Sequence, residues 1–520
     1  MDSAADLRGR GSWSYSAAEY PVVAVTACSV LLILWAIAHI LYNIFLHPLR
    51  NHPGPKLWAA TRVPWCWYQY QGILHERLLE LHVKYGHTVR IAPYELSFTS
   101  DTAWKTIYGH RSVEMDKDPV FRLHTPTGAQ NILVADRQTH IRQRRLLSHA
   151  FSEKALREQE GILQTYVSKL LEQLSLRYTA GPLNMVAWYN FTTFDLIGDL
   201  SSGEKFGCLD KGDYVPFVRA TERIAKELTF TQMLIYFGVA GVRQFFLPKA
   251  VAGQRAQNMK RAIDTVERRI QRDTDRKDFL YYILAANDEK GMSRAEIHVN
   301  SFSFNIAGSE SSATALSGIT YHILTRSSAY SELIHEIRTS FTSEEEITIA
   351  STNDLKYLEA VISESLRLYP PVAGTLPRVV PAPGETIDGI HVPTGTTVGV
   401  HHFSCFRHPA NFHRPDEFLP ERWLPECKDV PPFDKDNRAA VQPFSFGPRN
   451  CLGKNLARAE MRLIMAKLLW RFDLELVPGG GGSGKGMGMG NGKSWRDGQK
   501  VWGFWVKPPL MCWLRPVSRD

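Results

Sequence analysis

The stretch FSFGPRNCLG, residues Phe444–Gly453, decides how this 520-residue chain is interpreted. It frames Cys451 between two glycines, and apolar residues then recur every three to four positions, which predicts a helix. The cysteine is therefore expected on a tight loop at a helix N-terminus, where unpaired N–H groups and the helix dipole favour a thiolate, the form that binds metals. The two glycines permit close approach of the backbone to a flat, bulky group.

A lone cysteine is usually a buried structural residue, and that is the alternative to weigh. The pattern F-x-x-G-x-R-x-C-x-G is more specific than a lone cysteine, and it resembles the haem-binding loop of the cytochrome P450 family. The resemblance implies that Cys451 is the thiolate ligand of the iron in haem b (iron protoporphyrin IX). It also implies that Arg449 pairs with a haem propionate, that Phe444 packs near the sulfur side of the ring, and that Gly447 and Gly453 belong to the haem-binding loop.

Glu364 and Arg367 lie three positions apart in a predicted helix that Thr352 or Asn353 is expected to cap. Taken alone, they would form an exposed pair worth about 0.2–0.5 kcal/mol. An E-x-x-R helix followed by a P-E-R-W segment, which contains Arg422, resembles the buried charge network of the same family. The resemblance implies that these three charged residues hold the loop that presents the cysteine.

The segment AGSESS, residues 307–312, lies inside a helical pattern from about residue 294 to about residue 325. The alternative is a slightly kinked core helix, because serine and glycine are weak helix formers. The segment resembles the family's A-G-x-D/E-T-T/S motif, which implies that Ala307 and Gly308 lie over the haem in a bulged helix. Glu310 and Ser311 would then relay protons during oxygen activation. Ser311 stands where the family usually has threonine, and losing the methyl that restricts the rotamer weakens the expectation of efficient coupling.

Two further stretches supply basic residues. HIRQRR, residues 140–145, would ordinarily form a solvated basic face, and Arg378 follows the E-x-x-R helix in a strand-like segment. The family directs a W-x-x-x-R or H-x-x-x-R pair toward the haem propionates. The resemblance therefore implies propionate contacts for His140 and Arg144, and a further one for Arg378.

The resemblance covers most of the chain from about residue 50, and it implies the cytochrome P450 fold. We expect one mainly α-helical catalytic domain with small β-sheets, an α+β arrangement, at residues 57–520. The formal net charge is +8, but no compact basic run or recognition motif indicates a nucleic-acid partner. A diffuse basic excess favours an anionic membrane surface and an acidic redox partner. The seven cysteines include no C-x-x-C pair, which argues against a zinc site or a disulfide framework.

Residues 21–46 form an apolar run of 26 residues between an N-terminal tail, residues 1–20, and a stiff proline-rich hinge, residues 47–56. As a helix the run would span about 39 Å, enough to cross a hydrocarbon core of about 30 Å. More basic residues follow the run than precede it, which predicts a single-pass anchor with a cytosolic catalytic domain. In the family this arrangement belongs to enzymes of the endoplasmic reticulum membrane.

Residues 479–493 are glycine-rich and predict a flexible loop between strands at 472–477 and 501–506. A literal G-x-G-x-x-G occurs there, but no helix signal follows to complete a dinucleotide or phosphate site. The turn at Lys507–Leu510 resembles the family's last substrate-contacting hairpin.

The candidate substrate contacts are mostly apolar and indicate a lipophilic small molecule, although each of them also suits a core position. They are Phe121, Phe304, Val372, Leu376 and Trp505. The C-terminal part of the chain most resembles fungal monooxygenases that tailor terpenoids or polyketides in secondary metabolism.

These resemblances imply a monooxygenase that takes electrons from NADPH through NADPH–cytochrome P450 reductase, with cytochrome b5 as a second candidate donor. The alternative is a haem-thiolate isomerase or dehydratase that needs no dioxygen, but an acid and a hydroxyl in the oxygen groove argue against it. A scaffold protein that kept the fold without catalysis would need a damaged cysteine loop, and this loop is intact.

Overall fold

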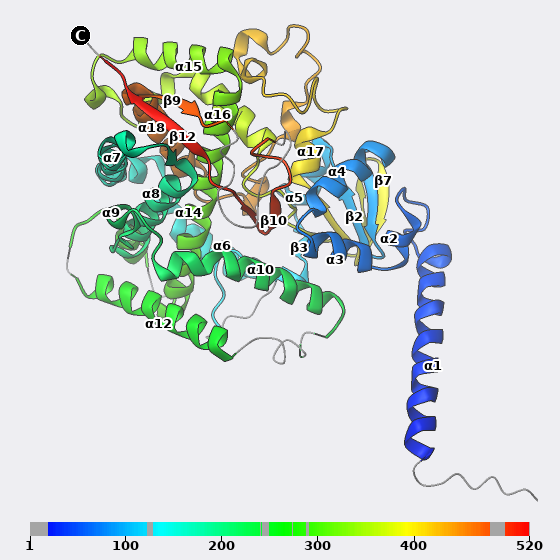
Figure 1. Cartoon of the computed structure of the whole chain (residues 1–520). Helices are drawn as coiled ribbons and strands as arrows, with labels where there is room; N and C mark the ends of the chain where they lie inside the picture. Colours follow the sequence, from blue (N-terminus) through cyan, green and yellow to red (C-terminus); the bar gives the residue numbers. More distant parts are fainter. Residues whose placement is uncertain are drawn as a thin grey trace, which may run out of the picture.

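The computed structural model describes residues 19–121, 128–239, 241, 249–272, 274–287, 291–478 and 494–518. These residues form a mainly α-helical body with small β-sheets, as the sequence predicted (Figure 1). The tail before residue 19 and the glycine-rich loop at residues 479–493 lie outside the described residues.

The helices are α1 (Glu19–Leu41), α2 (Lys56–Ala60), α3 (Val63–Tyr70), α4 (Leu74–Tyr85), α5 (Asp101–Tyr108), α6 (Arg137–Leu147), α7 (Glu153–Ser175), α8 (Met185–Ser202), α9 (Cys208–Lys211), α10 (Pro216–Tyr236), α12 (Lys249–Gln271), α13 (Phe279–Ala285), α14 (Arg294–Thr325), α15 (Ser327–Ser340), α16 (Lys356–Leu368), α17 (His402–Arg407) and α18 (Lys454–Arg471). The strands are β1 (Thr88–Ala92), β2 (Glu95–Phe98), β3 (Asp116–Lys117), β4 (Leu183–Asn184), β5 (Arg378–Val379), β6 (Gly384–Ile387), β7 (Ile390–Pro393), β8 (Thr397–Val400), β9 (Phe472–Leu476), β10 (Lys500–Trp502), β11 (Phe504–Val506) and β12 (Met511–Pro516).

The largest sheet has five strands in the order β1-β2-β8-β5-β3 and lies beside the point where α1 leaves the body (Figure 1). Its strands pair antiparallel except for β2 and β8, which run parallel. A three-stranded sheet, β4-β12-β9, and the hairpins β6–β7 and β10–β11 complete the β-structure of the described residues. In register, Lys117 of β3 lies opposite Arg378 of β5, so this sheet edge carries two adjacent cations.

Helix α14 crosses the centre of the molecule (Figure 1). A capping box starts it, because the Ser293 hydroxyl accepts from the Glu296 N–H and the Glu296 carboxylate accepts from the Ser293 N–H. The helix spans 32 residues, or about 48 Å. It packs against α8, α16 and α18 in the largest apolar cluster, so most of its faces are buried.

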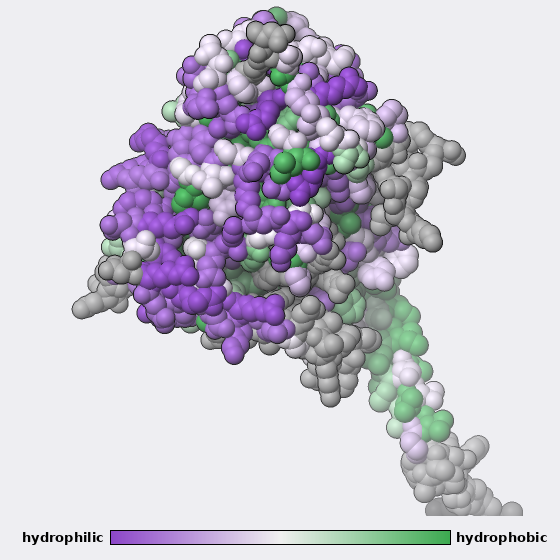
Figure 2. Space-filling model, turned by 60° about the vertical axis from the view of Figure 1, so that its left-hand side comes forward, coloured by the Kyte–Doolittle hydropathy of each residue, from purple (hydrophilic) through white to green (hydrophobic). Residues whose placement is uncertain are grey.

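Helix α1 projects from the body, and most of its side chains are exposed (Figures 1 and 2). Together with the helical turn η1 (Tyr42–Leu46) it gives an apolar helix from Pro21 to Leu46 with a mean hydropathy of 2.4, long enough to cross a membrane. In Figure 2 it forms a hydrophobic stalk below a largely hydrophilic body. The exposure is what a lipid-facing helix requires, because its apolar side chains find no partner in the protein.

The segment predicted as a hinge is packed into the body. Leu49 is fully buried in the apolar cluster of the five-stranded sheet, and the ring of His47 packs edge-on against Tyr94. Asn43 Nδ2 donates to the Ala60 carbonyl at 2.9 Å, and Arg90 Nη1 donates to the Asn43 carbonyl at 3.0 Å. The end of the anchor is therefore fixed to the body by buried contacts.

Two local expectations were wrong. Helix α16 begins at Lys356 without a cap from its own segment; instead the Glu336 carboxylate of α15 accepts from the Tyr357 and Leu358 N–H groups at 2.7 and 2.8 Å. The strand expected at residues 501–506 is a hairpin, because Gly503 adopts a left-handed conformation, φ 78°, and turns β10 back on β11.

Candidate haem-binding site

The cysteine loop is a tight turn between the five-stranded sheet region and α18. The short helical turn η11 (Gly447–Arg449) begins it, and the Cys451 N–H closes it by donating to the Phe444 carbonyl at 2.8 Å. Gly447 has φ 72°, and a Cβ at this position would collide with the Tyr108 carbonyl at the end of α5. The turn therefore requires glycine, both for its backbone conformation and for the space beside α5.

Cys451 has an accessible side chain although it lies deep in the protein. Burial raises its pKa, while the Gly453 N–H, Arg144 and Lys454 act to lower it. The helix N-terminus was expected to favour the thiolate, and the Gly453 N–H acts in that direction, although burial outweighs it in the protein without a metal. The groups that favour the thiolate are nonetheless in place, and binding to a metal cation would displace the thiol proton.

The wall that α14 contributes is made of small residues. Ala307 is exposed in the middle of a mostly buried helix, and a Cβ on Gly308 would collide with Ile197 of α8. The Ser311 hydroxyl, also accessible, donates to the Ala307 carbonyl at 2.6 Å. The helix is α-helical through this segment, so the described structure shows no bulge there. Accessible Ala307 and Ser311 mark a space beside α14 that protein side chains leave unfilled.

Glu310 and Ser311 point to different partners. Adjacent residues of an α-helix project about 100° apart, and the Glu310 carboxylate forms an ion pair with the Lys507 ammonium just after β11. Lys507 Nζ also donates to Thr314 Oγ1 at 2.8 Å. The structure therefore does not bring the predicted acid and hydroxyl together. Sequence reasoning missed Lys507 as a partner, although it had singled out the turn that begins with it.

Basic residues gather beside the cysteine loop. Arg144 donates to the Asn450 carbonyl and to Asn450 Oδ1, both at 2.7 Å, and Arg449 pairs with Glu114 at 2.7 Å and donates to the Ala135 carbonyl at 2.9 Å. Arg378 is buried, and its Nη1 has no hydrogen-bond partner among the described residues.

The same cluster includes His140, which was predicted, and Lys117, which sequence reasoning missed. Burial, with Arg449, Lys117, Arg144 and Arg378 close by, lowers the pKa of His140 to about 3. Burial and the charges of Arg378 and Arg449 lower the pKa of Lys117 to about 7. These mutual effects show that the cations converge on one region. Arg378 Nη1, a buried guanidinium nitrogen without an acceptor among the described residues, fits a carboxylate such as those of a haem group.

The predicted charge network is assembled and fully buried. Arg367 donates to both carboxylate oxygens of Glu364 at 2.8 Å, and Arg422 Nε donates to Glu364 Oε1 at 3.1 Å. Burial would raise the pKa of Glu364, but Arg367 and Arg422 hold it below its ordinary value. Arg422 also pairs with Asp436, a member that the sequence did not reveal. The network joins α16 to the turn η8 (Pro420–Trp423) and to the segment that leads into the cysteine loop.

The predicted substrate contacts are scattered. Trp505 is buried, stacks on Tyr369 at 4.5 Å, and donates its indole N–H to the Pro370 carbonyl at 2.8 Å, which gives it a core position. Phe304 packs edge-on against both Phe151 and Phe279. The three other candidates, Phe121, Val372 and Leu376, are half-buried.

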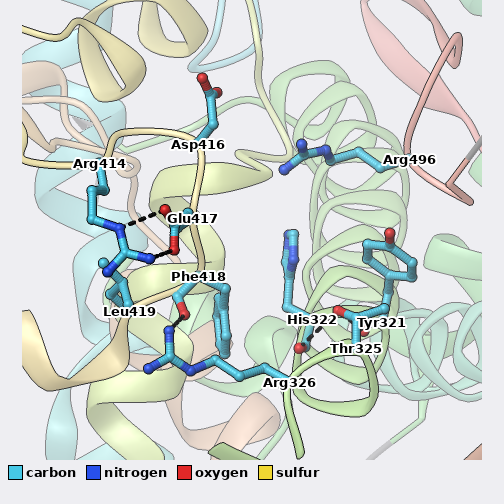
Figure 3. Close-up of a pocket in the computed structure, with 10 residues that line it drawn as sticks. All are labelled: Tyr321, His322, Thr325, Arg326, Arg414, Asp416, Glu417, Phe418, Leu419 and Arg496. Atoms are coloured by element: carbon cyan, nitrogen blue, oxygen red, sulfur yellow. Dashed lines mark hydrogen bonds and ion pairs between the residues drawn. The ribbon is translucent and has the colours of Figure 1, made fainter.

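A polar pocket of about 480 Å³ lies at the C-terminal end of α14 (Figure 3). Its charged groups are mostly paired with one another or with the backbone: Arg414 pairs with Glu417, and Arg326 donates to the Phe418 carbonyl at 2.5 Å. None of the predicted haem or substrate residues lines it.

Comparisons with known proteins show the family of this chain. The sequence profile of the family described as "Cytochrome P450" matches residues 53–486. Cytochrome P450 monooxygenase astJ of Aspergillus oryzae is 41% identical over 490 residues, which cover 93% of this chain and 95% of the relative. Averantin hydroxylase of Dothistroma septosporum is 40% identical over 489 residues (94% and 90%). Cytochrome P450 monooxygenase stcF of Emericella nidulans is 40% identical over 492 residues (94% and 99%).

The match to the family profile spans the charge network, the small-residue wall of α14 and the cysteine loop. The relatives are fungal enzymes, and each aligns with this chain over nearly its whole length. The chain therefore belongs to the cytochrome P450 family and is a monooxygenase of the type found in fungal secondary metabolism.

Proposed function

We propose that the protein binds haem b through Cys451 and oxidises a lipophilic small molecule by inserting one atom of dioxygen into a C–H or C=C bond. For a C–H bond the balance is RH + O2 + 2 electrons + 2 protons giving ROH + H2O. The haem, when bound, supplies dioxygen activation and electron transfer. The electrons would come from NADPH through NADPH–cytochrome P450 reductase, with cytochrome b5 as an additional donor.

One observation carries this proposal: an accessible cysteine lies beside a group of buried cations that includes an unsatisfied arginine nitrogen. Cys451 would be the iron ligand, while Arg144, Arg378 and Arg449, with His140 nearby, would hold the propionates. Bidentate guanidinium groups suit carboxylates better than a point charge does, and they would fix the orientation of the ring. The loop residues Phe444, Gly447 and Gly453 would pack against its sulfur side.

On the α14 side of the site, opposite Cys451, residues of the chain itself would deliver protons and leave room for the substrate. Ser311 can pass on a proton from its hydroxyl, because its oxygen is accessible and its proton is held by the Ala307 carbonyl in the resting structure. Glu310, which is ion-paired with Lys507 and turned away from Ser311, would have to leave Lys507 and take up a proton from solvent before it could replace that proton. Ala307 and Gly308 keep this wall of the site thin, so that a flat group and a small substrate can both fit beside α14.

The substrate class we propose is a terpenoid or polyketide intermediate. One relative at 40% identity is named as a hydroxylase of averantin, which supports a lipophilic substrate for this chain. Turnover of lipophilic extracts from the producing organism, followed by mass spectrometry, tests the class. Products without an added oxygen atom would contradict monooxygenation and favour the isomerase or dehydratase alternative.

We propose the endoplasmic reticulum membrane as the location, with α1 as a single-pass anchor and the catalytic body in the cytosol. The exposed apolar helix supports the anchor, and the excess of basic residues after it supports the orientation. Protease protection of microsomes tests this arrangement: the body should be digested without detergent. A protected body would reverse the proposed topology.

The haem assignment is tested by the carbon-monoxide difference spectrum of the reduced protein. Wild type should give the thiolate-type band, Cys451→Ser should abolish it, and Cys427→Ser, at a half-buried cysteine outside the loop, should keep it. Incorporation of label from isotopic dioxygen into the product tests the reaction. A folded, haem-loaded wild type without the thiolate-type band would refute the assignment.

A further inference from the structure

The polar pocket at the C-terminal end of α14 holds an arginine without a carboxylate partner. In Figure 3 the Arg496 side chain reaches the pocket from the side opposite Glu417. Glu417 is already paired with Arg414, whereas the Arg496 side chain makes no ion pair or hydrogen bond within the described part of the chain. The loop that leads into Arg496, residues 479–493, contains no aspartate or glutamate and therefore supplies no carboxylate. The pocket thus offers a guanidinium group that is available to a ligand.

A second, buried arginine adds positive charge behind the pocket. Arg407 of α17 is 6% exposed, and its Nε and Nη2 have no acceptor among the described residues. It pairs at 3.5 Å with Asp416, a pocket residue whose side chain is 67% exposed, so this carboxylate compensates the charge only weakly. Burial and the charge of Arg496 lower the pKa of Arg407 to about 9, although Asp416 and Asp497 oppose the change. Positive charge therefore exceeds negative charge in this region.

His322 of α14 supplies a neutral polar group to the same pocket. It is 3% exposed, its ring stacks on Phe418 with centroids 5.1 Å apart, and its Nε2 has no partner among the described residues. Burial, Arg496 and Arg407 lower its pKa well below the ordinary value, so the imidazole is neutral at physiological pH and carries one N–H donor. Buried polar atoms are normally hydrogen-bonded, and a ligand that accepts a hydrogen bond would satisfy this ring.

The wall opposite Arg496 is held in place by backbone hydrogen bonds. Arg367 donates to the Pro415 carbonyl at 2.6 Å and to the Glu417 carbonyl at 3.0 Å, and Arg326 donates to the Phe418 carbonyl at 2.5 Å. A wall fixed in this way needs little ordering when a ligand binds. The pocket volume of about 480 Å³ is within the range of small-molecule sites, about 300–1,000 Å³.

We propose that this pocket binds a small organic molecule through an oxyanionic group, a phosphate or a carboxylate. Arg496 is its principal cation, His322 is a hydrogen-bond donor, and Arg407 contributes buried positive charge. A guanidinium group suits such an anion because its N–H groups can bind two oxygens at once. The space beside Tyr321 takes the organic part of the ligand. The proposal does not rest on the monooxygenase function, since no predicted haem or substrate residue lines the pocket.

The main test is titration of inorganic phosphate into the purified holoenzyme, measured by calorimetry at an ionic strength held constant with sodium chloride. Wild type should bind phosphate saturably, and Arg496→Gln should bind it about tenfold more weakly, because a charge-assisted contact is lost. Arg157→Gln is the matched control: it removes the same charge from an exposed position of α7 outside the pocket, and it should bind like wild type.

A second variant tests the pocket independently of Arg496. His322→Phe keeps a ring to stack on Phe418 and removes the donor, so phosphate should bind about fivefold more weakly. The same titrations with citrate identify the source of the anion: tighter binding of citrate, weakened equally by Arg496→Gln, would assign the pocket to carboxylates. Absence of saturable binding of either anion to wild type, or equal affinity in wild type and Arg496→Gln, would overturn the proposal.

Discussion

At the scale of single residues, the position of Cys451 is determined by hydrogen bonds and turns of the surrounding backbone. Gly447 lets the loop turn next to the Tyr108 carbonyl, and the Cys451 N–H donates to the Phe444 carbonyl. The sulfur is consequently held by the main chain, with Arg144 and Lys454 nearby. A rigid backbone cradle of this kind fixes the direction from which a metal can approach.

Ser311 gives the first prediction. Ser311→Ala should keep the thiolate-type spectrum and divert reducing equivalents to hydrogen peroxide, because the hydroxyl beside the accessible wall is lost. Ser311→Thr should match or exceed wild-type coupling, since the added methyl restricts the rotamer. Product and peroxide measured per NADPH decide the outcome; an alanine variant as coupled as wild type would exclude a role for this hydroxyl.

Glu460 gives a pH prediction. The carboxyl is buried against Ser312, whose hydroxyl donates to it at 2.8 Å, and burial raises its pKa from about 4.5 to about 8. Between these values the unfolded chain loses the proton while the folded protein keeps it, so this group makes the free energy of unfolding fall as pH rises. Below about pH 4.5 both states are protonated and the loss disappears.

Glu460→Gln should remove that slope and stabilise the protein at pH 7 by up to about 3 kcal/mol relative to wild type. Denaturant unfolding of both proteins across pH 5 to 8 measures the difference, in which other groups cancel. Glu172→Gln, an exposed glutamate on α7, serves as the control and should leave the pH dependence unchanged. A constant difference between Glu460→Gln and wild type across this range would contradict the buried neutral acid.

At the scale of elements, much of the site follows from short-range patterns. The motif predicted that a loop would precede α18, and the helical periods predicted α14 and α16. The sequence did not reveal which residues from distant segments would contact these elements. Glu336 caps α16 from another helix, and Lys507 reaches Glu310 from the end of the chain. Such pairs depend on how the elements pack, which no local period encodes.

The Glu364–Arg367–Arg422 network joins α16 to the turn η8 through fully buried ion pairs. Arg367→Leu should lower the free energy of unfolding by about 3–5 kcal/mol, because it leaves Glu364 buried with less compensation. The chain holds a matched control in Arg414 and Glu417, an Arg–Glu pair with the same three-residue separation but exposed to solvent. Arg414→Leu should cost less than about 1 kcal/mol. Equal losses of unfolding free energy in the two variants would show that burial does not increase the contribution of the network to stability.

At the scale of the whole molecule, the boundary between anchor and body differs from the sequence-based estimate. The catalytic domain was expected to begin at residue 57, yet Asn43, His47 and Leu49 are buried in the body. Apolar composition predicted the exposed N-terminal helix, and proline-rich composition predicted a stiff segment after it. Composition cannot show that the joint is packed, because that depends on Ala60, Arg90 and the sheet behind them.

Truncation tests that boundary. A chain that begins at residue 42 should be as stable as the full-length protein, since α1 is exposed and contributes little to the core. A chain that begins at residue 51 should lose about 2–5 kcal/mol, because it lacks buried Leu49 and the Asn43 hydrogen bonds. Denaturant unfolding of both proteins in the same detergent measures the difference. Equal stability of the two truncated chains would show that residues 42–50 behave as a free linker.

The convergence of His140, Arg144, Arg378 and Arg449 also bears on how much of the protein a cell accumulates. His140 is neutral and Arg449 is paired with Glu114, but Arg378 is buried beside Arg449 and its Nη1 has no acceptor among the described residues, so the folded chain depends on a group that supplies a carboxylate there. Ligand that binds only the folded state stabilises it in proportion to supply. Iron or porphyrin starvation should therefore reduce the protein's abundance through degradation, while the level of its messenger RNA is still unchanged.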